Sequence, residues 1–328
     1  MNDTVFDVRV CAARLLAEGV LSFELRPADG ADLPAFTAGS HIDLHLPNGL
    51  VRNYSLVNSP AERHRYVLAV SKDANSTGGS RYLFENQMVG QTLKISAPRN
   101  NFTLVEDAAH VVLIAGGIGI TPLHSMILRL EDMAAGWELH YGVRDRAAAA
   151  FRRDFEALEE ARPGRVHFNF DAEEGRMLDV EHVVAQAPAD AHLYCCGPLP
   201  MLEIFNAAVK GRTPETVHVE YFTPPGERAG PDASAVSEGL KTFTVVLKGS
   251  GESYEIGPED SILGVLLENG VSAAWSCGEG MCGTCLVEVA EGEPDHKDFI
   301  LSENERASNR MMTICVSGSK SKKLVIDL

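Results

Sequence analysis

The stretch Cys277-Gly-Glu-Gly-Met-Cys282-Gly-Thr-Cys285 places three cysteines in one short loop. A fourth, Cys315, follows after 29 intervening residues. The chain has 328 residues and seven cysteines, an odd number, and disulfide frameworks belong mainly to short secreted chains. In a chain of this size, thiols grouped so tightly indicate metal ligation or redox chemistry in a reducing compartment.

The spacing of these cysteines separates two kinds of metal centre. C-x4-C-x2-C with a distant fourth cysteine is the spacing with which four thiolates hold a [2Fe–2S] cluster in plant-type ferredoxins. Zinc usually takes two C-x2-C pairs, or a cysteine pair with a histidine pair, so zinc remains the poorer alternative. Gly278, Gly280 and Gly283 permit the unusual dihedral angles and close approach that let loop N–H groups point at sulfur. The predicted cluster ligands are Cys277, Cys282, Cys285 and Cys315.

The composition limits the partners that the protein can have. A formal net charge of −17 argues against nucleic acid and against anionic membrane surfaces, both of which need concentrated Lys and Arg. The simplest interpretation of this charge is solubility, and the sharper one is steering toward a basic patch on a protein partner. No apolar run is long enough for a membrane span, and the N-terminus lacks the pattern of a secretory signal. We therefore expect a cytoplasmic protein.

Hydrophobic patterning divides the chain into three parts. Up to residue 104, short alternating apolar runs at 42–46, 66–70 and 93–95 are broken by turn residues, which indicates a small antiparallel β-barrel domain. From 105 to 225, a continuous apolar run at 111–115 and further strand patterns alternate with helical spacing, which indicates an α/β domain with a parallel sheet. The further strands are expected at 137–143, 166–170 and 192–196, and a helix at 123–130.

The last part carries the cysteine cluster. Residues 226–240 are rich in Pro, Gly and Ala and are expected to form an interdomain linker. A new alternating stretch, Phe243-Thr-Val-Val-Leu247, begins the third domain, residues 241–328. With a plant-type ferredoxin cluster, this domain is expected to have an α+β, β-grasp fold.

Arg52-Asn53-Tyr54-Ser55 follows one of the expected barrel strands. An R-x-Y-S pattern in a small barrel resembles the flavin site of the ferredoxin–NADP reductase superfamily. In that setting Arg52 can pair with a phosphate, Tyr54 can lie against the flavin ring, and Ser55 can hydrogen-bond near its reactive nitrogen. The alternative is that Tyr54 is an ordinary packing residue of a barrel strand.

A Gly-rich turn, Thr77-Gly78-Gly79-Ser80, precedes an expected helix at 81–87. Backbone N–H groups at a helix start, with Thr and Ser hydroxyls, can bind an anion, although a plain turn capped by Ser80 is the alternative. A cradle for one phosphate favours FMN over FAD, for which no adenine site is recognised. The predicted flavin-binding residues are Arg52, Asn53, Tyr54, Ser55, Thr77, Gly78, Gly79 and Ser80.

A second Gly-rich turn follows the apolar run at 111–115. It lacks the G-x-G-x-x-G fingerprint, but glycines between a strand and a helix allow a pyrophosphate to approach the backbone. Asp171, at the end of the expected strand 166–170, can bind ribose hydroxyls and repel a 2′-phosphate, which favours NADH over NADPH unless this carboxylate is simply solvated. The predicted nucleotide-binding residues of these two segments are Gly116, Gly117, Gly119, Thr121, Pro122 and Asp171.

The stretch Tyr194-Cys195-Cys196-Gly197-Pro198 ends another expected strand. In the same superfamily a C-G-P at this place lies beside the nicotinamide, so Cys196, Gly197 and Pro198 are predicted to contact it and Cys196 to lie near the hydride path. The alternative is that both cysteines are small buried residues. Alternation along a strand places only one of the two on each face of the sheet.

These motifs occur together and in one order: R-N-Y-S-L, T-G-G-S, G-G-I-G-I-T-P, Y-C-C-G-P and C-x4-C-x2-C…C. In this the chain resembles the phthalate dioxygenase reductase family, which includes the reductases of aromatic-ring dioxygenases and of vanillate-type O-demethylases. The resemblance covers nearly the whole chain. It implies FMN, NADH and a [2Fe–2S] cluster, and a terminal oxygenase, of Rieske type, as the protein partner. It also implies that Phe222 approaches the flavin ring and acts with Ser55 and Cys196 in hydride transfer.

The implied function is a reductase that converts the two-electron chemistry of NADH into single electrons. A hydride carries two electrons, a [2Fe–2S] cluster accepts one, and a flavin can exchange either number. Two alternatives remain. The acceptor can be a different hydroxylase without a Rieske centre, or the chain can be a non-catalytic protein that offers its ferredoxin domain for docking.

Overall fold

The computed structural model describes residues 5–72, 78–222, 242–301 and 303–328. The chain divides into two units, Met1–Phe222 and Thr223–Leu328. The boundary expected between residues 104 and 105 falls inside the first unit, and the expected linker, 226–240, lies outside the described residues, as does Thr77. The division into three domains therefore stays a prediction.

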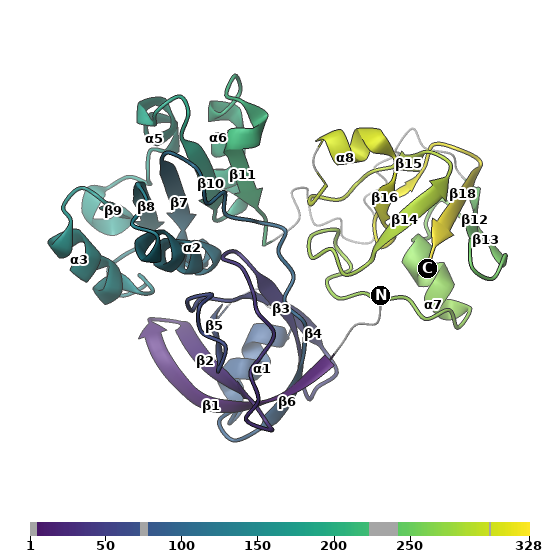
Figure 1. The fold of residues 1–328 in the computed structure, drawn as a ribbon, viewed down its shortest axis with the longest axis horizontal. Helices are drawn as coiled ribbons and strands as arrows, with labels where there is room; N and C mark the ends of the chain where they lie inside the picture. Colours follow the sequence, from purple (N-terminus) through teal and green to yellow (C-terminus); the bar gives the residue numbers. More distant parts are fainter. Residues whose placement is uncertain (1–4, 73–77, 223–241, 302) are drawn as a thin grey trace. The chain divides into compact units, whose positions relative to one another are not determined.

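The N-terminal half of the first unit is an antiparallel barrel (Figure 1). Its strand order is β4-β3-β6-β1-β2-β5, and the barrel closes where the chain beyond β4 meets β5 at the Leu56–Leu68 bridge. Hydrophobic side chains alternate inward along the strands, as expected for one apolar face. The strands are β1 (Val5–Ala17), β2 (Val20–Pro27), β3 (His41–His45), β4 (Val51–Ser55), β5 (Tyr66–Ser71) and β6 (Thr92–Ser96).

A short helix, α1 (Gly79–Glu85), lies between β5 and β6 and buries Leu83 in the barrel core. It begins two residues before the expected 81–87 because Gly78, with φ 107°, turns the chain into the helix. Its C-cap is Asn86, whose backbone is extended. The Asn86 side-chain amide donates to the Tyr82 carbonyl at 2.9 Å.

The second half of the first unit is a parallel five-stranded sheet with the order β11-β10-β7-β8-β9. Successive strands first run outward from β7 through β8 to β9, and the chain then returns to add β10 and β11 on the other side of β7. The strands are β7 (Val111–Gly116), β8 (Trp137–Val143), β9 (Val166–Phe170), β10 (His192–Cys196) and β11 (Val217–Glu220). This reversal of strand order lies between β7 and β10, where open α/β sheets bind ligands.

Helices cover both faces of the parallel sheet. One hydrophobic cluster joins α2 and α3 to one face, and another joins α5 and α6 to the other face. The α2 helix begins at Ile120, earlier than the expected 123, because a single 3-10 turn, η1 (Gly117–Gly119), leads directly into it. The helices are α2 (Ile120–Asp132), α3 (Arg152–Ala161), α4 (Asp171–Glu174), α5 (Val180–Gln186) and α6 (Leu199–Ala208), with a second 3-10 turn, η2 (Pro214–Thr216), before β11.

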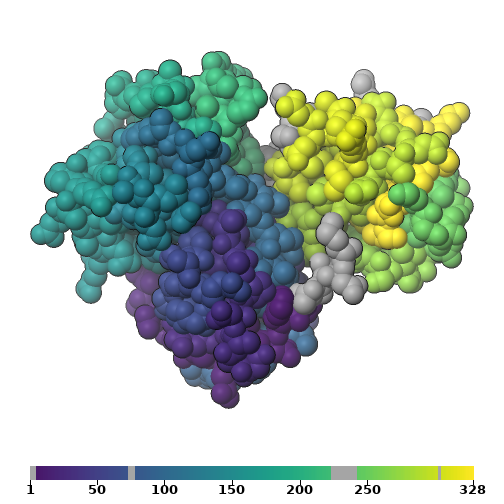
Figure 2. Space-filling view, in the orientation of Figure 1, coloured from purple at the N-terminus to yellow at the C-terminus, as the bar shows by residue number. Residues whose placement is uncertain are grey.

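The barrel and the parallel sheet of the first unit are joined by buried polar contacts. His124 Nδ1 lies 2.7 Å from the Val57 carbonyl, and the Ser125 hydroxyl donates to the Asn58 carbonyl at 3.0 Å. The Tyr194 hydroxyl binds the segment that leads out of the barrel, where it donates to the Thr103 carbonyl at 3.1 Å and accepts from the Val105 N–H at 2.8 Å. We call these polar contacts of His124, Ser125 and Tyr194 the interlock. The atoms of the two halves are also in contact in the space-filling view (Figure 2).

The second unit has an α+β fold. Its main sheet has the order β13-β12-β18-β14-β16, and a two-stranded sheet pairs β15 with β17. Helix α7 (Ile262–Glu268) is capped by Ser261, whose hydroxyl accepts from the Gly264 N–H at 3.0 Å. The other elements are β12 (Phe243–Leu247), β13 (Ser253–Ile256), β14 (Leu286–Glu291), β15 (Pro294–Asp295), α8 (Glu303–Ser308), β16 (Met311–Thr313), β17 (Gly318–Ser319) and β18 (Lys323–Asp327).

The predicted fold class is confirmed: an antiparallel barrel, a parallel α/β sheet and an α+β unit follow one another along the chain. Within the described ranges, no helix combines the length and the apolar content that crossing a bilayer requires.

Candidate functional site

The cysteine loop lies between α7 and β14, and Cys315 follows β16. Cys282, Cys285 and Cys315 are buried and Cys277 is partly exposed. The thiols interact in two pairs, Cys277 with Cys282 and Cys285 with Cys315. The structure therefore brings the four predicted ligands together, three from one loop and the fourth from the turn after β16.

Hydrogen-bond donors of the loop are aimed at the sulfur atoms. The Glu279 N–H donates to Cys277 Sγ at 3.3 Å, and the Cys277 N–H donates to Cys282 Sγ at 3.5 Å. The Thr284 hydroxyl lies 3.2 Å from the same sulfur. The thiol of Cys277, followed by Thr284 and the backbone donors, lowers the pKa of Cys282 to about 5. This donor set suits thiolates that carry the negative charge of an iron–sulfur cluster.

Three glycines give the loop its shape, as predicted. Gly278, Gly280 and Gly283 all have positive φ, at 71°, 74° and 75°. A Cβ on Gly280 would also lie 2.7 Å from Val316 Cγ2 and 3.2 Å from Asp298 Cα. A larger residue would therefore be strained in its backbone and would push the loop away from its support.

Asp298 supports the loop from behind. Its side chain is fully buried and accepts from the N–H groups of Ile300 and Leu301 at 3.2 and 2.8 Å. Arg306 lies 3.6 Å from the same carboxylate, and the neighbouring Phe299 N–H donates to the Gly280 carbonyl at 3.0 Å. The pattern of cysteines and glycines does not indicate this carboxylate.

The predicted flavin residues of the barrel lie on β4. A Cβ on Gly79 would lie 2.5 Å from Arg52 Cγ and 2.9 Å from its Nε, so the Arg52 side chain passes directly over the glycine at the start of α1. Tyr54 packs against the barrel cluster and Ser55 is buried. The structure thus brings Arg52, Gly78, Gly79 and Ser80 to one place, a donor set with the chemistry of a phosphate cradle.

Asn53 has a partner within the barrel. Its side-chain amide donates to Asp43 Oδ1 at 3.1 Å, and Arg99 donates to the other oxygen of Asp43 at 2.6 Å. Asp43 is buried, so this arrangement satisfies a carboxylate inside the barrel wall. A role of Asn53 in flavin binding stays a prediction.

The two predicted nicotinamide segments meet where the strand order reverses. Cys196 is paired with Ala115 across β10 and β7. A Cβ on Gly119 would lie 2.1 Å from the Cys196 carbonyl oxygen, and one on Gly197 would lie 3.1 Å from Gly116 Cα. These glycines therefore let the two strand ends approach each other closely, which leaves their backbone at the expected ligand crevice.

The remaining residues of the first segment have separate roles in the turn. Gly117 has φ 52°, and a Cβ added to it would meet no atom within 4 Å, so its backbone faces open space. Thr121 is buried, and its hydroxyl donates to the Ile118 carbonyl at 3.0 Å. Pro122 lies in the first turn of α2 as predicted. The turn is therefore held from inside by Thr121 and open at Gly117.

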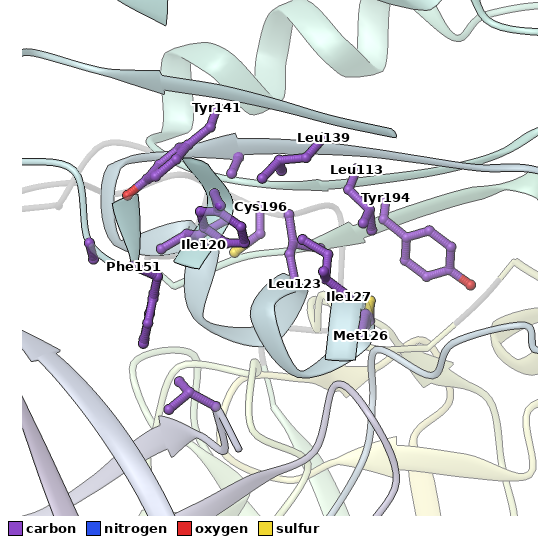
Figure 3. Close-up of a cluster of buried hydrophobic side chains, with 14 of the residues drawn as sticks. Leu113, Ile120, Leu123, Met126, Ile127, Leu139, Tyr141, Phe151, Tyr194 and Cys196 are labelled. Atoms are coloured by element: carbon purple, nitrogen blue, oxygen red, sulfur yellow. The ribbon is translucent and has the colours of Figure 1, made fainter. Parts of the chain in front are cut away.

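Cys195 and Cys196 are both fully buried, on opposite faces of the sheet, as the alternation predicts. Figure 3 shows Cys196 among Ile120, Leu123 and Tyr141 of one hydrophobic cluster. Burial, together with the nearby Glu220, raises the pKa of the Cys196 thiol well above its usual value. The residue therefore sits at the end of β10 as a neutral thiol, and contact of Cys196, Gly197 and Pro198 with nicotinamide stays a prediction.

Asp171 begins α4 directly after β9, at the carboxyl edge of the sheet, as predicted. Its Oδ1 accepts from the Asn169 side-chain amide at 2.7 Å, which orients the carboxylate. Since neighbouring strands lie about 4.8 Å apart, Asp171 stands roughly 10 Å from the end of β7, two strands away. Binding of a ribose there remains a prediction.

One predicted residue follows β11, and the last residue of β11 is one that the sequence did not reveal. Phe222 is 41% exposed, so its ring is available to a ligand. Glu220, paired with Cys196 across β11 and β10, has a buried Oε2 with no hydrogen-bond partner among the described residues. Burial raises its pKa to about 8. The sequence signal was a single carboxylate at the end of the strand Val217-His218-Val219-Glu220.

Two family models match separate parts of the chain. A 2Fe-2S iron-sulfur cluster binding domain matches residues 245–319, and an oxidoreductase NAD-binding domain matches residues 113–207. The first match contains all four predicted cluster ligands, and the second contains both strand ends of the nucleotide crevice.

Whole-chain relatives agree with these matches. The tetrachlorobenzoquinone reductase of Sphingobium chlorophenolicum is 47% identical, with 99% of this chain and 98% of that protein covered. The vanillate O-demethylase oxidoreductase of Acinetobacter baylyi is 39% identical, with 98% of each covered. The structure of phthalate dioxygenase reductase, described as modular for electron transfer from pyridine nucleotides to [2Fe-2S], superposes with a TM-score of 0.70 at 34% identity and covers 99% of this chain and 98% of that one. The chain belongs to the phthalate dioxygenase reductase family of NAD-dependent iron–sulfur oxidoreductases.

Proposed function

We propose that this protein is the reductase component of a multicomponent oxygenase. It takes electrons from NADH, passes them through bound FMN and a [2Fe–2S] cluster, and delivers them one at a time to a terminal oxygenase of Rieske type. The observation that carries this proposal is the loop of Cys277, Cys282 and Cys285, whose N–H and hydroxyl donors point at sulfur in the same chain as a nucleotide crevice.

The nucleotide half of the proposal depends on two glycine-lined strand ends. Gly117 leaves the backbone of the β7 turn open to a pyrophosphate, Gly116 and Gly119 let this turn pack closely against the end of β10, and α2 presents its N-terminus there. Asp171, oriented by Asn169, would accept from ribose hydroxyls and disfavour a 2′-phosphate. These residues support NADH rather than NADPH as the donor.

The barrel half would hold the flavin. Arg52 and the N–H groups at the start of α1 would bind a single phosphate, which favours FMN over FAD. Tyr54 and the exposed ring of Phe222 would flank the ring system, and the buried Ser55 would orient it. When bound, the flavin supplies the exchange between two-electron and one-electron chemistry.

The partner and location follow from charge and from thiols. With a net charge of −17, the reductase would be steered toward a basic patch on its oxygenase, and association would weaken with salt. None of the seven cysteines, all of which lie in the described ranges, forms a disulfide, which fits the reducing cytoplasm that we propose as its location.

A second acceptor deserves a test because one relative, at 47% identity, is named as a tetrachlorobenzoquinone reductase. A small quinone needs no protein partner and can take electrons without the cluster. Assays with candidate Rieske oxygenases and with a chlorinated benzoquinone would separate the two functions. If a variant without the cluster still reduced the quinone at full rate, quinone reduction would be favoured as the function.

The central experiment is the Cys282→Ser variant, with Cys11→Ser as the matched control because Cys11 is exposed on β1. Cys282→Ser should abolish reduction of cytochrome c or an oxygenase and leave reduction of ferricyanide by NADH, which needs only the flavin. Cys11→Ser should leave both rates unchanged. Loss of both rates in a folded Cys282→Ser protein would contradict the proposed order. Acid extraction and chromatography of the flavin would decide between FMN and FAD.

A further inference from the structure

A cluster of imidazole and carboxylate groups lies on the parallel sheet, away from the strand ends that form the nucleotide crevice. Glu138 and His140 are two apart on β8 and therefore share one face. His167, on the edge strand β9, is the direct neighbour of His140. The function proposed above uses none of these three side chains.

Their ligand atoms are close together. One nitrogen of each histidine and one oxygen of Glu138 all lie within 4.8 Å of one another. His140 Nε2 is 3.7 Å from Glu138 Oε1, and His110, just before β7, brings its Nε2 to 3.9 Å from the same oxygen. The rings of His140 and His167 are stacked with centroids 4.7 Å apart.

Burial and charge prepare these groups for a cation. The Glu138 and His140 side chains are only 26% and 17% exposed, whereas His167 is exposed at the sheet edge. The site therefore offers a carboxylate beside two imidazoles, with access from solvent through His167.

We propose that Glu138, His140 and His167 bind a divalent transition metal, with zinc as the best match. Two imidazoles and one carboxylate form a ligand set that zinc uses widely, whereas magnesium and calcium prefer sets made of oxygen. A water molecule, or His110, would complete four-coordination.

For zinc to bind, the three donor atoms must move slightly closer together. Zinc bonds of about 2.0–2.2 Å in a tetrahedron place the donor atoms roughly 3.3–3.5 Å apart. Glu138 and His140 are already near this separation, at 3.7 Å. The exposed His167 supplies the rest by rotation of its side chain, because its ring is not enclosed by other residues.

A metal at this place would tie β8 to the edge strand β9. The carboxyl end of β9 leads into Asp171, the predicted ribose ligand, so the tie would stabilise the strand that positions it. The expected consequence is a higher melting temperature in zinc, by mass action on the folded state.

The test uses tag-free protein with its flavin and cluster in place and zinc as the probe. Calorimetric titration should detect one zinc site, and His167→Ala, His140→Ala and Glu138→Gln should each weaken it at least about tenfold, the lower end for loss of an outer-shell partner. His182→Ala, an exposed histidine on α5, is the matched control and should leave the affinity unchanged. Zinc X-ray absorption should show nitrogen and oxygen neighbours.

Two results would overturn the proposal. Zinc affinity and the zinc-dependent melting shift could be unchanged in His167→Ala, which removes an exposed side chain and should fold normally. Alternatively, the absorption spectrum could show sulfur neighbours, which would place zinc on cysteine instead. The site is separate from the residues proposed for electron transfer, so NADH oxidation without added zinc should be the same in all four variants. A failure of the zinc proposal would therefore leave the proposed electron-transfer function unaffected.

Discussion

The two groups of cysteines in this chain show how surroundings decide what a thiol can do. In the loop, the Cys277 thiol, followed by Thr284 and a backbone N–H, lowers the pKa of Cys282, while the same pairing raises the pKa of Cys277. At the end of β10, Cys195 and Cys196 are enclosed by hydrophobic clusters, and burial raises their pKa. The loop is suited to hold thiolates on a metal, and the strand end keeps its thiols neutral.

The difference arises from the neighbouring thiol and the hydrogen-bond donors rather than from burial. Cys282 and Cys196 are both buried. In a strand, however, the N–H groups are used by the sheet ladder, whereas the positive-φ glycines of the loop turn N–H groups toward sulfur. Glycine placement therefore supplies the backbone donors to sulfur that a buried cysteine in a strand lacks.

The largest expected effect comes from breaking the close packing at the strand end. In Gly119→Ala the new Cβ would lie 2.1 Å from the Cys196 carbonyl oxygen and 2.4 Å from its carbon, both backbone atoms that cannot rotate away. We expect a loss of about 3 kcal/mol in the free energy of unfolding and loss of NADH binding. Denaturant unfolding and NADH titration would measure these.

Gly117→Ala provides the control for this prediction. Its added Cβ would have no neighbour within 4 Å, but its φ of 52° is unfavourable for alanine. The expected cost is about 1 kcal/mol. Equal stability of Gly119→Ala and the unmodified protein would show that the strand ends are not packed as closely as described.

A second prediction concerns the support of the cysteine loop. Asp298→Ala removes a fully buried carboxylate and leaves the N–H groups of Ile300 and Leu301 without their acceptor, while Arg306 loses the ion pair but keeps its hydrogen bond to the main-chain carbonyl of residue 298. We expect destabilisation of the second unit by about 3 kcal/mol and easier loss of the cluster. Asp298→Asn keeps one acceptor oxygen and should lose less, as judged by thermal melting followed at the cluster absorbance. If both variants melted alike, the charge would be irrelevant to the loop.

A third prediction uses the pH dependence of Glu220, beside Cys196. Its pKa is about 8 in the folded protein against 4.5 for a solvent-exposed glutamate, because burial disfavours the charged form. Between these pH values the folded state keeps a proton that the unfolded chain has released, so the contribution of Glu220 to stability falls as pH rises from about 4.5 to 8.

Glu220→Gln should therefore flatten the decline of stability over this pH range and exceed the unmodified protein at pH 8. Unfolding measured at several pH values would check this, with Glu181→Gln, an exposed residue of α5, as the control. A Glu220→Gln protein with an unchanged pH profile would mean that the carboxylate is solvated.

The smallest predicted effect sharpens the comparison inside the loop. Thr284→Val removes the hydroxyl 3.2 Å from Cys282 Sγ and keeps the shape of the side chain. A donor to sulfur stabilises the more negative, reduced cluster, so its loss should lower the reduction potential by roughly 40 mV, which corresponds to about 1 kcal/mol for one electron. Redox titration would measure it, and an unchanged or raised potential would contradict the assignment of Thr284 as a donor.

The sequence predicted most of the architecture because local pattern and burial agree there. The strands Trp137–Val143, Val166–Phe170, His192–Cys196 and Phe243–Leu247 have the expected bounds. Helix starts were less accurate, since they depend on turns such as η1 and on the φ of Gly78, which hydrophobic spacing does not report.

The candidate site was predictable where chemistry fixes the spacing and not where it depends on tertiary contacts. The cysteine ligands follow from loop geometry, and the glycines Gly116, Gly119 and Gly197 from the need for close approach. Asp298 and Glu220 were missed because a carboxylate in a sequence carries no sign of being buried. The internal partner of Asn53, Asp43, was missed because it comes from the neighbouring strand β3.

The interlock bears on how such reductases can be recombined. His124 and Ser125 bind the barrel through the main-chain carbonyls of Val57 and Asn58, so a graft that exchanged only the barrel or only the parallel sheet would leave buried polar groups unpaired unless it kept these carbonyls in place. A chimera joined after Phe222 would cut none of these bonds. A chimera designed to change the electron acceptor should therefore exchange the C-terminal unit and keep residues 1–222 together.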